Sequence, residues 1–163
     1  MPFFRYAPAL LVLFLNGAAV AQAPDDPARA DTVSWTVQPL EIAKKNGHAE
    51  LTLHGSVAPG WHVYSLKQLP QGPTPLLVSV AANDVATADG APSGSAPTKF
   101  RDPAFGLETQ FYTGQFSLTV PVRFKPQGTA QAVPVDVRFQ TCNGRVCQPP
   151  KTVHLSAAVM SGK

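Results

Sequence analysis

Charged residues are scarce in this sequence of 163 amino acids, and neither sign is in large excess. Asp, Glu, Lys and Arg make up 14% of the chain, with 13 basic against 10 acidic side chains. No cluster of Lys or Arg interleaved with aromatic residues occurs in it. Because a nucleic-acid-binding surface needs such a basic footprint to contact phosphates, the composition excludes nucleic acid as a partner.

Long apolar runs are also lacking beyond the N-terminus. The run Ala7–Leu15 follows Arg5 and is shorter than the ~20 residues that a membrane-spanning helix needs. It leads to Ala19-Val20-Ala21, an A-x-A cleavage pattern, and these features together are typical of a secretory signal peptide. We therefore predict a signal peptide over residues 1–21, a flexible leader over 22–31, a single domain over 32–163 and no membrane span after cleavage.

No stretch keeps an apolar period of 3.6 residues over three helical turns, whereas apolar and polar residues alternate in several segments. The clearest alternation covers 115–124, and others cover 33–37, 50–57 and 133–140, with a short last strand at 153–155. Alternation with period two is typical of half-buried strands. We predict an all-β fold, an antiparallel β-sandwich of about seven to nine strands, in which residues 81–97 form a long loop or irregular edge.

Cysteine is nearly absent too, but the two cysteines present, Cys142 and Cys147, lie close together in the sequence. Asn143-Gly144 between them is a strong turn signal, because both residue types tolerate positive φ. The chain should therefore fold back and bring the two sulfurs together. If the alternation of the preceding strand continues, Cys142 lies on the outward face with the other even-numbered residues, on an exposed hairpin. An exported protein exposes such a pair to an oxidising compartment.

Three roles are open to this pair. As a structural disulfide it would close a loop of about six residues, which stabilises by only roughly 2 kcal/mol, against nearly 5 for a hundred-residue loop. A redox role is favoured by the predicted exposure, a feature of labile disulfides, and by Arg145 in the loop, whose charge favours a thiolate. A metal site would need further ligands nearby, and we predict no metal and no cofactor. The histidines are scattered at His48, His54, His62 and His154.

Three segments resemble the N-terminal periplasmic domain of the transmembrane thiol:disulfide interchange protein DsbD. The run from Phe139 to Pro150, which holds both cysteines, is similar to the end of that domain. Gly60-Trp61-His62-Val63-Tyr64 resembles its aromatic strand, and Asp102-Pro103-Ala104-Phe105-Gly106 resembles its short cap loop. The resemblance implies an immunoglobulin-like sandwich in the periplasm that acts in protein-disulfide reduction. The electron donor would be a thioredoxin-like or membrane-embedded thiol:disulfide oxidoreductase, and the acceptors would be oxidised envelope proteins.

The resemblance also implies roles for single residues. Cys147 would form the mixed disulfide with a partner, and Cys142 would resolve it. Phe105, in the same cap loop as Asp102, would shield the pair from stray oxidation. Three other side chains would lie beside the cysteines: Tyr64, its strand neighbour His62, and Asp102 of the cap loop.

The sequence departs from the family pattern in several places. His62 stands where the family domain has tyrosine, and Pro103 stands where its cap loop has an acidic residue. The cysteine spacing C-x4-C is one residue shorter than in DsbD. The membrane and thioredoxin-like domains of DsbD are not in this chain, so we expect the reductant to be a separate protein. The alternative function is a non-catalytic binding or assembly module with a structural hairpin disulfide. It stays open because a sandwich fold alone does not distinguish an exchange protein from a binding module.

Overall fold

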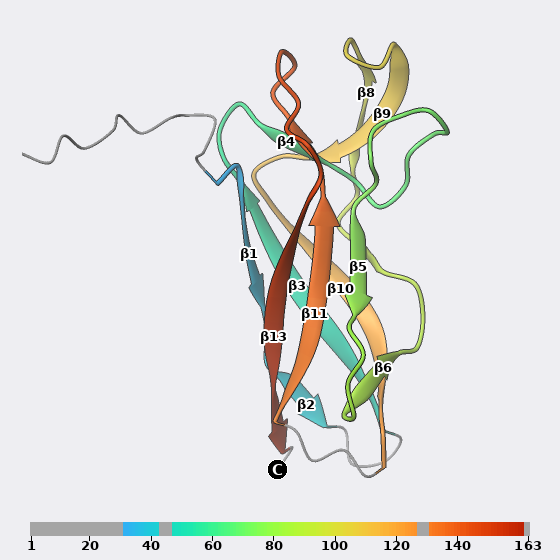
Figure 1. Cartoon of the computed structure of the whole chain (residues 1–163), viewed down its shortest axis with the longest axis vertical. Coiled ribbons are helices and arrows are strands. Elements are labelled where there is room, and N and C mark those ends of the chain that lie inside the picture. The colour runs from blue at the N-terminus through green and yellow to red at the C-terminus, as the bar shows by residue number, and fades with distance from the viewer. Residues whose placement is uncertain (1–30, 43–46, 127–130, 162–163) are drawn as a thin grey trace, which may run out of the picture. The chain divides into compact units, whose positions relative to one another are not determined.

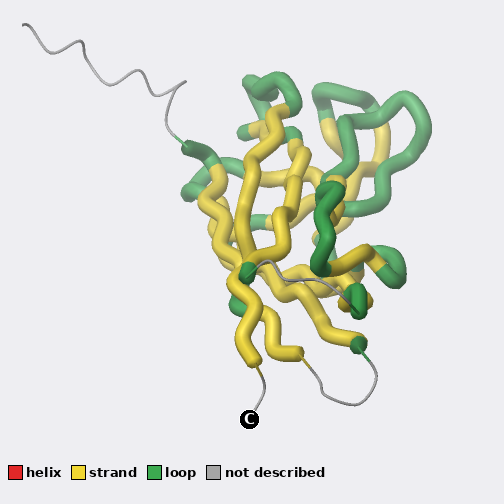
Figure 2. The backbone as a smooth tube through the Cα atoms, turned by 60° about the horizontal axis from the view of Figure 1, so that its bottom comes forward, coloured by secondary structure: helices red, strands yellow, loops and turns green. Residues whose placement is uncertain are grey.

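The computed structural model describes residues 31–42, 47–126 and 131–161, and within these ranges it contains strands and no helix (Figure 2). The predicted signal peptide over 1–21 and the leader up to residue 30 lie outside the described residues. In the described part of the chain, no helix is long and apolar enough to cross a membrane. The strands are β1 (Val33–Val37), β2 (Leu40–Ile42), β3 (His48–Val57), β4 (His62–Tyr64), β5 (Leu77–Val80), β6 (Ala86–Ala88), β7 (Ser93–Gly94), β8 (Thr98–Asp102), β9 (Leu107–Tyr112), β10 (Gln115–Phe124), β11 (Ala132–Phe139), β12 (Thr141–Cys142) and β13 (Lys151–Ser161).

These strands pair in three sheets (Figure 1). The first sheet has the order β1-β3-β10-β6, with β7 also paired to β10, and the second has the order β2-β13-β11-β5. The third sheet, β12-β4-β9-β8, is built from short strands near one end of the first two (Figure 1). The pairs are antiparallel except for β13 with β2, which is parallel.

The core lies between the first two sheets and follows from the alternation in the sequence. Every second residue of β3, β10 and β11 points inward, and the apolar side chains in the middle of these strands are at most 1% exposed. Burying each such side chain contributes about 1.5–3 kcal/mol. The inward residues that lead this core are Leu51, Leu53, Leu118, Val120, Val122, Val133, Val135 and Val137. The all-β, immunoglobulin-like sandwich predicted from the sequence is confirmed.

Two details of the strands differ from the prediction. There are more than seven to nine strands, because short edge segments such as β6 and β7, within the predicted irregular stretch 81–97, pair with β10. The last strand is long, since β13 pairs with β11 over its whole length from Ala132 to Phe139. The second half of β13 contains Ser156, Ala157 and Ala158, whose small side chains differ little in polarity between the two faces and so hide the alternation.

A glycine makes room for an aromatic cluster at the cysteine end of this core. Gly55 lies between Trp35 and Phe116 across the first sheet. The rings of these two residues meet edge to face, with centroids 5.4 Å apart, and Trp35 lies equally close to Phe139 of the second sheet. A Cβ atom on Gly55 would overlap the Phe116 ring. Glycine at this position therefore lets the rings join the two sheets.

Candidate functional site

Cys142 and Cys147 form a disulfide at the base of a tight hairpin, with their Cα atoms 4.0 Å apart. The N–H of Asn143 donates to the carbonyl of Val146 at 3.1 Å, which closes the four-residue loop. Of the two predicted turn residues only Gly144 adopts positive φ, at 81°. Asn143 instead uses its side-chain oxygen to accept the N–H groups of Arg145 and Val146 at 3.0 and 2.8 Å. The predicted hairpin is confirmed, and its asparagine works through its side chain.

The prediction that Cys142 faces outward is wrong. Cys142 is 0% exposed, and Cys147 is partly exposed. The chain leaves the second sheet after Phe139 and joins the third, where Thr141 and Cys142 pair with β4. Because the change of partner interrupts the alternation, Thr141 and Cys142 are both buried. Cys147 is therefore the more accessible cysteine of the pair, and Cys142 is enclosed.

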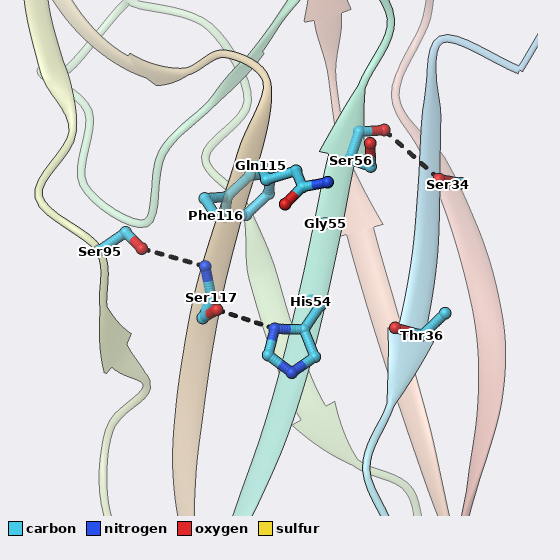
Figure 3. A pocket seen from close by; sticks show the side chains of 9 residues that line it. All are labelled: Ser34, Thr36, His54, Gly55, Ser56, Ser95, Gln115, Phe116 and Ser117. Atoms are coloured by element: carbon cyan, nitrogen blue, oxygen red, sulfur yellow. Dashed lines mark hydrogen bonds between the residues drawn. The ribbon is translucent and has the colours of Figure 1, made fainter.

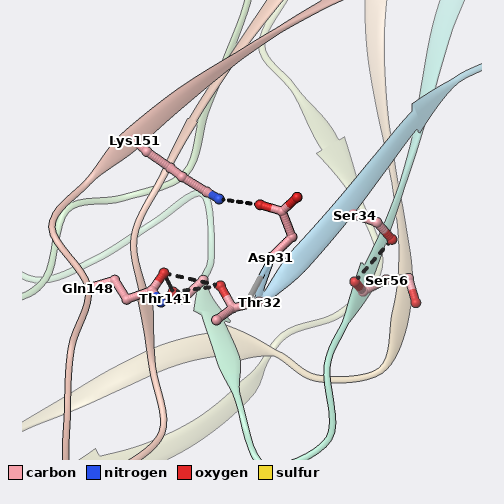
Figure 4. Close-up of polar contacts among 7 residues, drawn as sticks. All are labelled: Asp31, Thr32, Ser34, Ser56, Thr141, Gln148 and Lys151. Atoms are coloured by element: carbon pink, nitrogen blue, oxygen red, sulfur yellow. Dashed lines mark hydrogen bonds and ion pairs between the residues drawn. The ribbon is translucent and has the colours of Figure 1, made fainter. Parts of the chain in front are cut away.

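The base of the hairpin is tied to the start of β1 by polar contacts (Figure 4). The buried hydroxyls of Thr32 and Thr141 lie 3.0 Å apart, and both reach the side-chain oxygen of Gln148, at 3.4 and 3.3 Å. Lys151 adds an exposed ion pair with Asp31 at 2.9 Å. The N–H of Gln148 donates to the carbonyl of Thr141 at 2.9 Å. The hairpin is therefore held in place by contacts other than its disulfide. This network was not predicted from the sequence.

Tyr64 brings a hydroxyl to the accessible sulfur. Its hydroxyl donates to Oδ2 of Asp102 at 2.7 Å and lies 3.8 Å from Sγ of Cys147. Burial, followed by the hydrogen bond to Asp102, raises the pKa of Tyr64 well above its ordinary value of about 10. The phenol therefore stays protonated at neutral pH, as a donor between a carboxylate and a sulfur.

His62 lies opposite the enclosed cysteine in the sheet. It pairs directly with Cys142 across β4 and β12. Its ring packs against those of Tyr64 and Phe111, with centroids 5.1 and 4.6 Å apart. Its Nε2 is buried and has no hydrogen-bond partner among the described residues. Burial lowers the pKa of His62, against a weaker opposing effect of the Asp102 charge. The imidazole is consequently neutral at neutral pH. Phe111 was not predicted as a site residue, because in the sequence it is a single aromatic residue without a motif around it.

The turn between β8 and β9 carries Asp102 and Phe105. Oδ1 of Asp102 accepts the N–H of Ala104 at 2.9 Å, and its carbonyl accepts the N–H of Gly106 at 2.8 Å. Gly106 has φ 66°, a conformation that favours glycine. The turn therefore presents the half-buried ring of Phe105 edge-on to Tyr64, with centroids 5.9 Å apart.

The structure thus brings most of the predicted site residues together. Tyr64 and Asp102 gather at Cys147, and His62 lies at Cys142. The ring of Phe105 packs against that of Tyr64. Arg145 differs, since it is exposed in the loop, where water screens its charge and weakens its expected effect on the thiols.

A pocket on the outer face of the first sheet lies apart from the cysteines (Figure 3). Several of its polar groups pair with one another. Nδ1 of His54 lies 2.8 Å from the hydroxyl of Ser117, whose N–H donates to the hydroxyl of Ser95 at 3.0 Å. Its other lining residues come from β1, β3 and β10 and are mostly Ser, Thr and Gln. In the part of the chain that the structure describes, no group of three His, Cys, Asp or Glu could hold a metal ion.

Comparisons with known proteins match the part of the chain that contains these site residues. The family model described as thiol:disulfide interchange protein DsbD, N-terminal, matches residues 33–158. Among solved structures, the reduced DsbD N-terminal domain of Neisseria meningitidis is 20% identical, with a TM-score of 0.49, covering 75% of this chain and 83% of that one. The N-terminal periplasmic domain of ScsB from Proteus mirabilis is 18% identical, with a TM-score of 0.58, covering 84% of this chain and 49% of that one. At this identity the ScsB domain supports the fold alone. No curated protein matches the chain.

Proposed function

This chain belongs to the family of DsbD N-terminal domains, and on that premise we propose that it exchanges thiols and disulfides with other envelope proteins through Cys142 and Cys147. The observation that carries the proposal is the asymmetric disulfide, with one sulfur accessible beside Tyr64 and the other enclosed beside His62. A partner can reach one sulfur while the second waits within the same hairpin. This is the arrangement that exchange through a mixed disulfide requires.

The proposed reaction starts from the reduced pair. The thiolate of Cys147 attacks a disulfide of the partner, which releases one partner thiolate and leaves a mixed disulfide. Cys142 then attacks the sulfur of Cys147, which releases the second partner thiolate and restores the Cys142–Cys147 disulfide. The partner gains two electrons and this domain loses two. Because each step is reversible, the same chemistry reduces this domain when a thioredoxin-like or membrane-embedded oxidoreductase donates electrons.

The proposal includes the place where this exchange occurs. We propose that a signal peptide over residues 1–21 directs the protein to the periplasm. The mature protein would then consist of a leader over 22–31 and a single domain over 32–163. The apolar run followed by the A-x-A pattern supports export, and the similar ScsB domain is described as periplasmic. N-terminal sequencing of the secreted protein would test cleavage after Ala21.

Trapping tests which sulfur meets the partner. Cys142→Ser should accumulate mixed disulfides through Cys147, because the second step is blocked and the accessible sulfur remains. Cys147→Ser should trap little, since the remaining sulfur is 0% exposed. The measurement is non-reducing electrophoresis of periplasmic extracts followed by mass spectrometry. The reversed pattern would contradict the order of attack, and trapping by neither variant would contradict the exchange function.

The burial of Cys142 favours one other candidate, a structural disulfide in a non-catalytic binding module. Structural disulfides have reduction potentials below about −300 mV, whereas oxidoreductases range from about −270 to −120 mV. Equilibration of the purified protein with glutathione and dithiothreitol buffers gives the potential of this pair. A value within the oxidoreductase range is expected, and one below it would favour the binding module.

A further inference from the structure

We propose that His62 accepts the thiol proton of Cys142 when that residue attacks the mixed disulfide at Cys147. The inference rests on the proposed exchange function and names the group that activates the enclosed sulfur. It explains why a histidine occupies this position of the aromatic strand. It also gives the two sulfurs different proton-handling neighbours.

The pairing of β4 with β12 places the two side chains together. His62 and Cys142 are direct partners in an antiparallel ladder, so their side chains project from the same face of the sheet. Cβ atoms of such partners lie about 4.5–5.5 Å apart, within reach of an imidazole ring. Because Cys142 is 0% exposed in the disulfide form, bulk water has little access to its sulfur. A proton acceptor supplied by the protein would therefore promote its ionisation.

The unpaired nitrogen of His62 supplies the second observation. Nε2 is buried without a hydrogen-bond partner among the residues described, although buried polar groups are normally paired. The structure contains the disulfide, in which Cys142 has no S–H group to donate. Reduction creates that donor on the residue that pairs with His62 across the two strands. In the neutral tautomer protonated at Nδ1, Nε2 is an acceptor and would pair with the new thiol.

The other charged or titratable groups near the ring are already engaged. Tyr64, on the same strand, donates to Asp102 of β8, and Oδ1 of Asp102 accepts the N–H of Ala104. The Tyr64 hydroxyl lies 3.8 Å from Sγ of Cys147. From β9 the apolar ring of Phe111 packs against the His62 ring. Burial lowers the pKa of His62, which keeps the ring neutral and able to accept a proton at neutral pH.

The proposed step conserves protons and electrons. Nε2 takes the proton of the Cys142 thiol, and the resulting thiolate attacks Sγ of Cys147 in the mixed disulfide. The bond between Cys147 and the partner breaks, and its electron pair leaves with the partner sulfur. The imidazolium then returns its proton to the leaving thiolate or to water. No other oxidant or reductant takes part.

The test separates the two steps of exchange in the full mature chain. Reduced protein is mixed with an equimolar aromatic disulfide, 5,5′-dithiobis(2-nitrobenzoate), in a stopped-flow spectrometer. The first equivalent of coloured thiolate reports attack by Cys147, and the second reports resolution by Cys142. In His62→Phe we expect the second phase to slow by about 100-fold, at the low end of general-base effects, and the first to stay within about twofold.

A pH profile distinguishes proton acceptance from simple packing. The second phase of the wild type should level off above the pKa of His62, whereas in His62→Phe it should keep rising with pH until the thiol itself ionises. His62→Gln, which keeps a polar side chain without a titrating group, should behave like His62→Phe and covers the case that phenylalanine disturbs the fold. His154→Phe removes an exposed histidine of β13 and is the matched control, with both phases unchanged.

The outcomes separate this inference from the proposed function. An unchanged second phase in both His62 variants overturns the role of His62 and leaves exchange intact. Equal slowing of both phases also overturns it, because the effect would then not be confined to Cys142. If the reduced wild type shows no first phase, the exchange function itself fails.

Discussion

Reducing the Cys142–Cys147 disulfide should leave the fold intact and lower the melting temperature only modestly. In the chain-entropy model, a closed loop of about six residues stabilises by roughly 2 kcal/mol. Domains of this size lose roughly 4 °C per kcal/mol, so we expect a shift of about 8 °C. The hairpin should persist, because Thr141 still pairs with β4, accepts the N–H of Gln148 and contacts Thr32.

Circular dichroism melts of oxidised and reduced protein measure this shift. The matched control is Cys142→Ala combined with Cys147→Ala, whose melting temperature should match that of reduced wild type and ignore the reductant. A total stability of about 5–15 kcal/mol exceeds the expected loss, so reduced protein should be folded at room temperature. Unfolding at room temperature, or a shift well above 15 °C on the same scale of roughly 4 °C per kcal/mol, would refute the reasoning and return the pair to the structural class.

Three further predictions follow from the residues around the site and the core. Phe105→Ala should make reduced protein react faster with hydrogen peroxide at little cost in stability. Phe100→Ala, on the exposed part of β8, should react at the rate of wild type. If Phe105→Ala also reacts at the wild-type rate, Phe105 does not shield the cysteines. Because the pKa of Tyr64 is raised, its contribution to stability is complete below the ordinary value of about 10 and is lost as pH rises further. Thermal melts of Tyr64→Phe should therefore show a shallower alkaline decline than wild type, and an identical decline would contradict the shift. Gly55→Ala should destabilise by about 1–3 kcal/mol in denaturant titrations, because its Cβ overlaps a packed ring, while Ser56→Ala on the same strand should be nearly neutral.

The sequence was sufficient for those features that depend on local pattern. The alternation in β10 predicts its buried face, and Asn143-Gly144 predicts the hairpin that joins the cysteines. The burial of Cys142 was not predictable in this way. It depends on the chain changing sheets after Phe139, an event set by tertiary pairing with β4 and not by the residues of the strand itself.

Contacts between segments distant in sequence were the other limit. The resemblance to the DsbD domain names Tyr64 and Asp102 as neighbours of the cysteines, but no local pattern shows that the hydroxyl of one donates to the carboxylate of the other. Likewise, nothing in the sequence distinguishes Thr32 from an ordinary polar residue at the start of a strand. Its buried contact with Thr141 arises only when the first strand and the cysteine hairpin fold against each other.

The two oxygens of Asp102 have a consequence for how mutational data on this site are interpreted. One oxygen holds the turn that presents Phe105, and the other holds the hydroxyl beside Cys147. Removing the carboxylate alters the steric cover and the local field at once, so single substitutions at Asp102 and Phe105 report overlapping effects. Their kinetic effects should be non-additive, as is general for residues that share contacts. Only a double-mutant cycle over the two positions separates the barrier that the ring presents to oxidants from the charge that surrounds the sulfur.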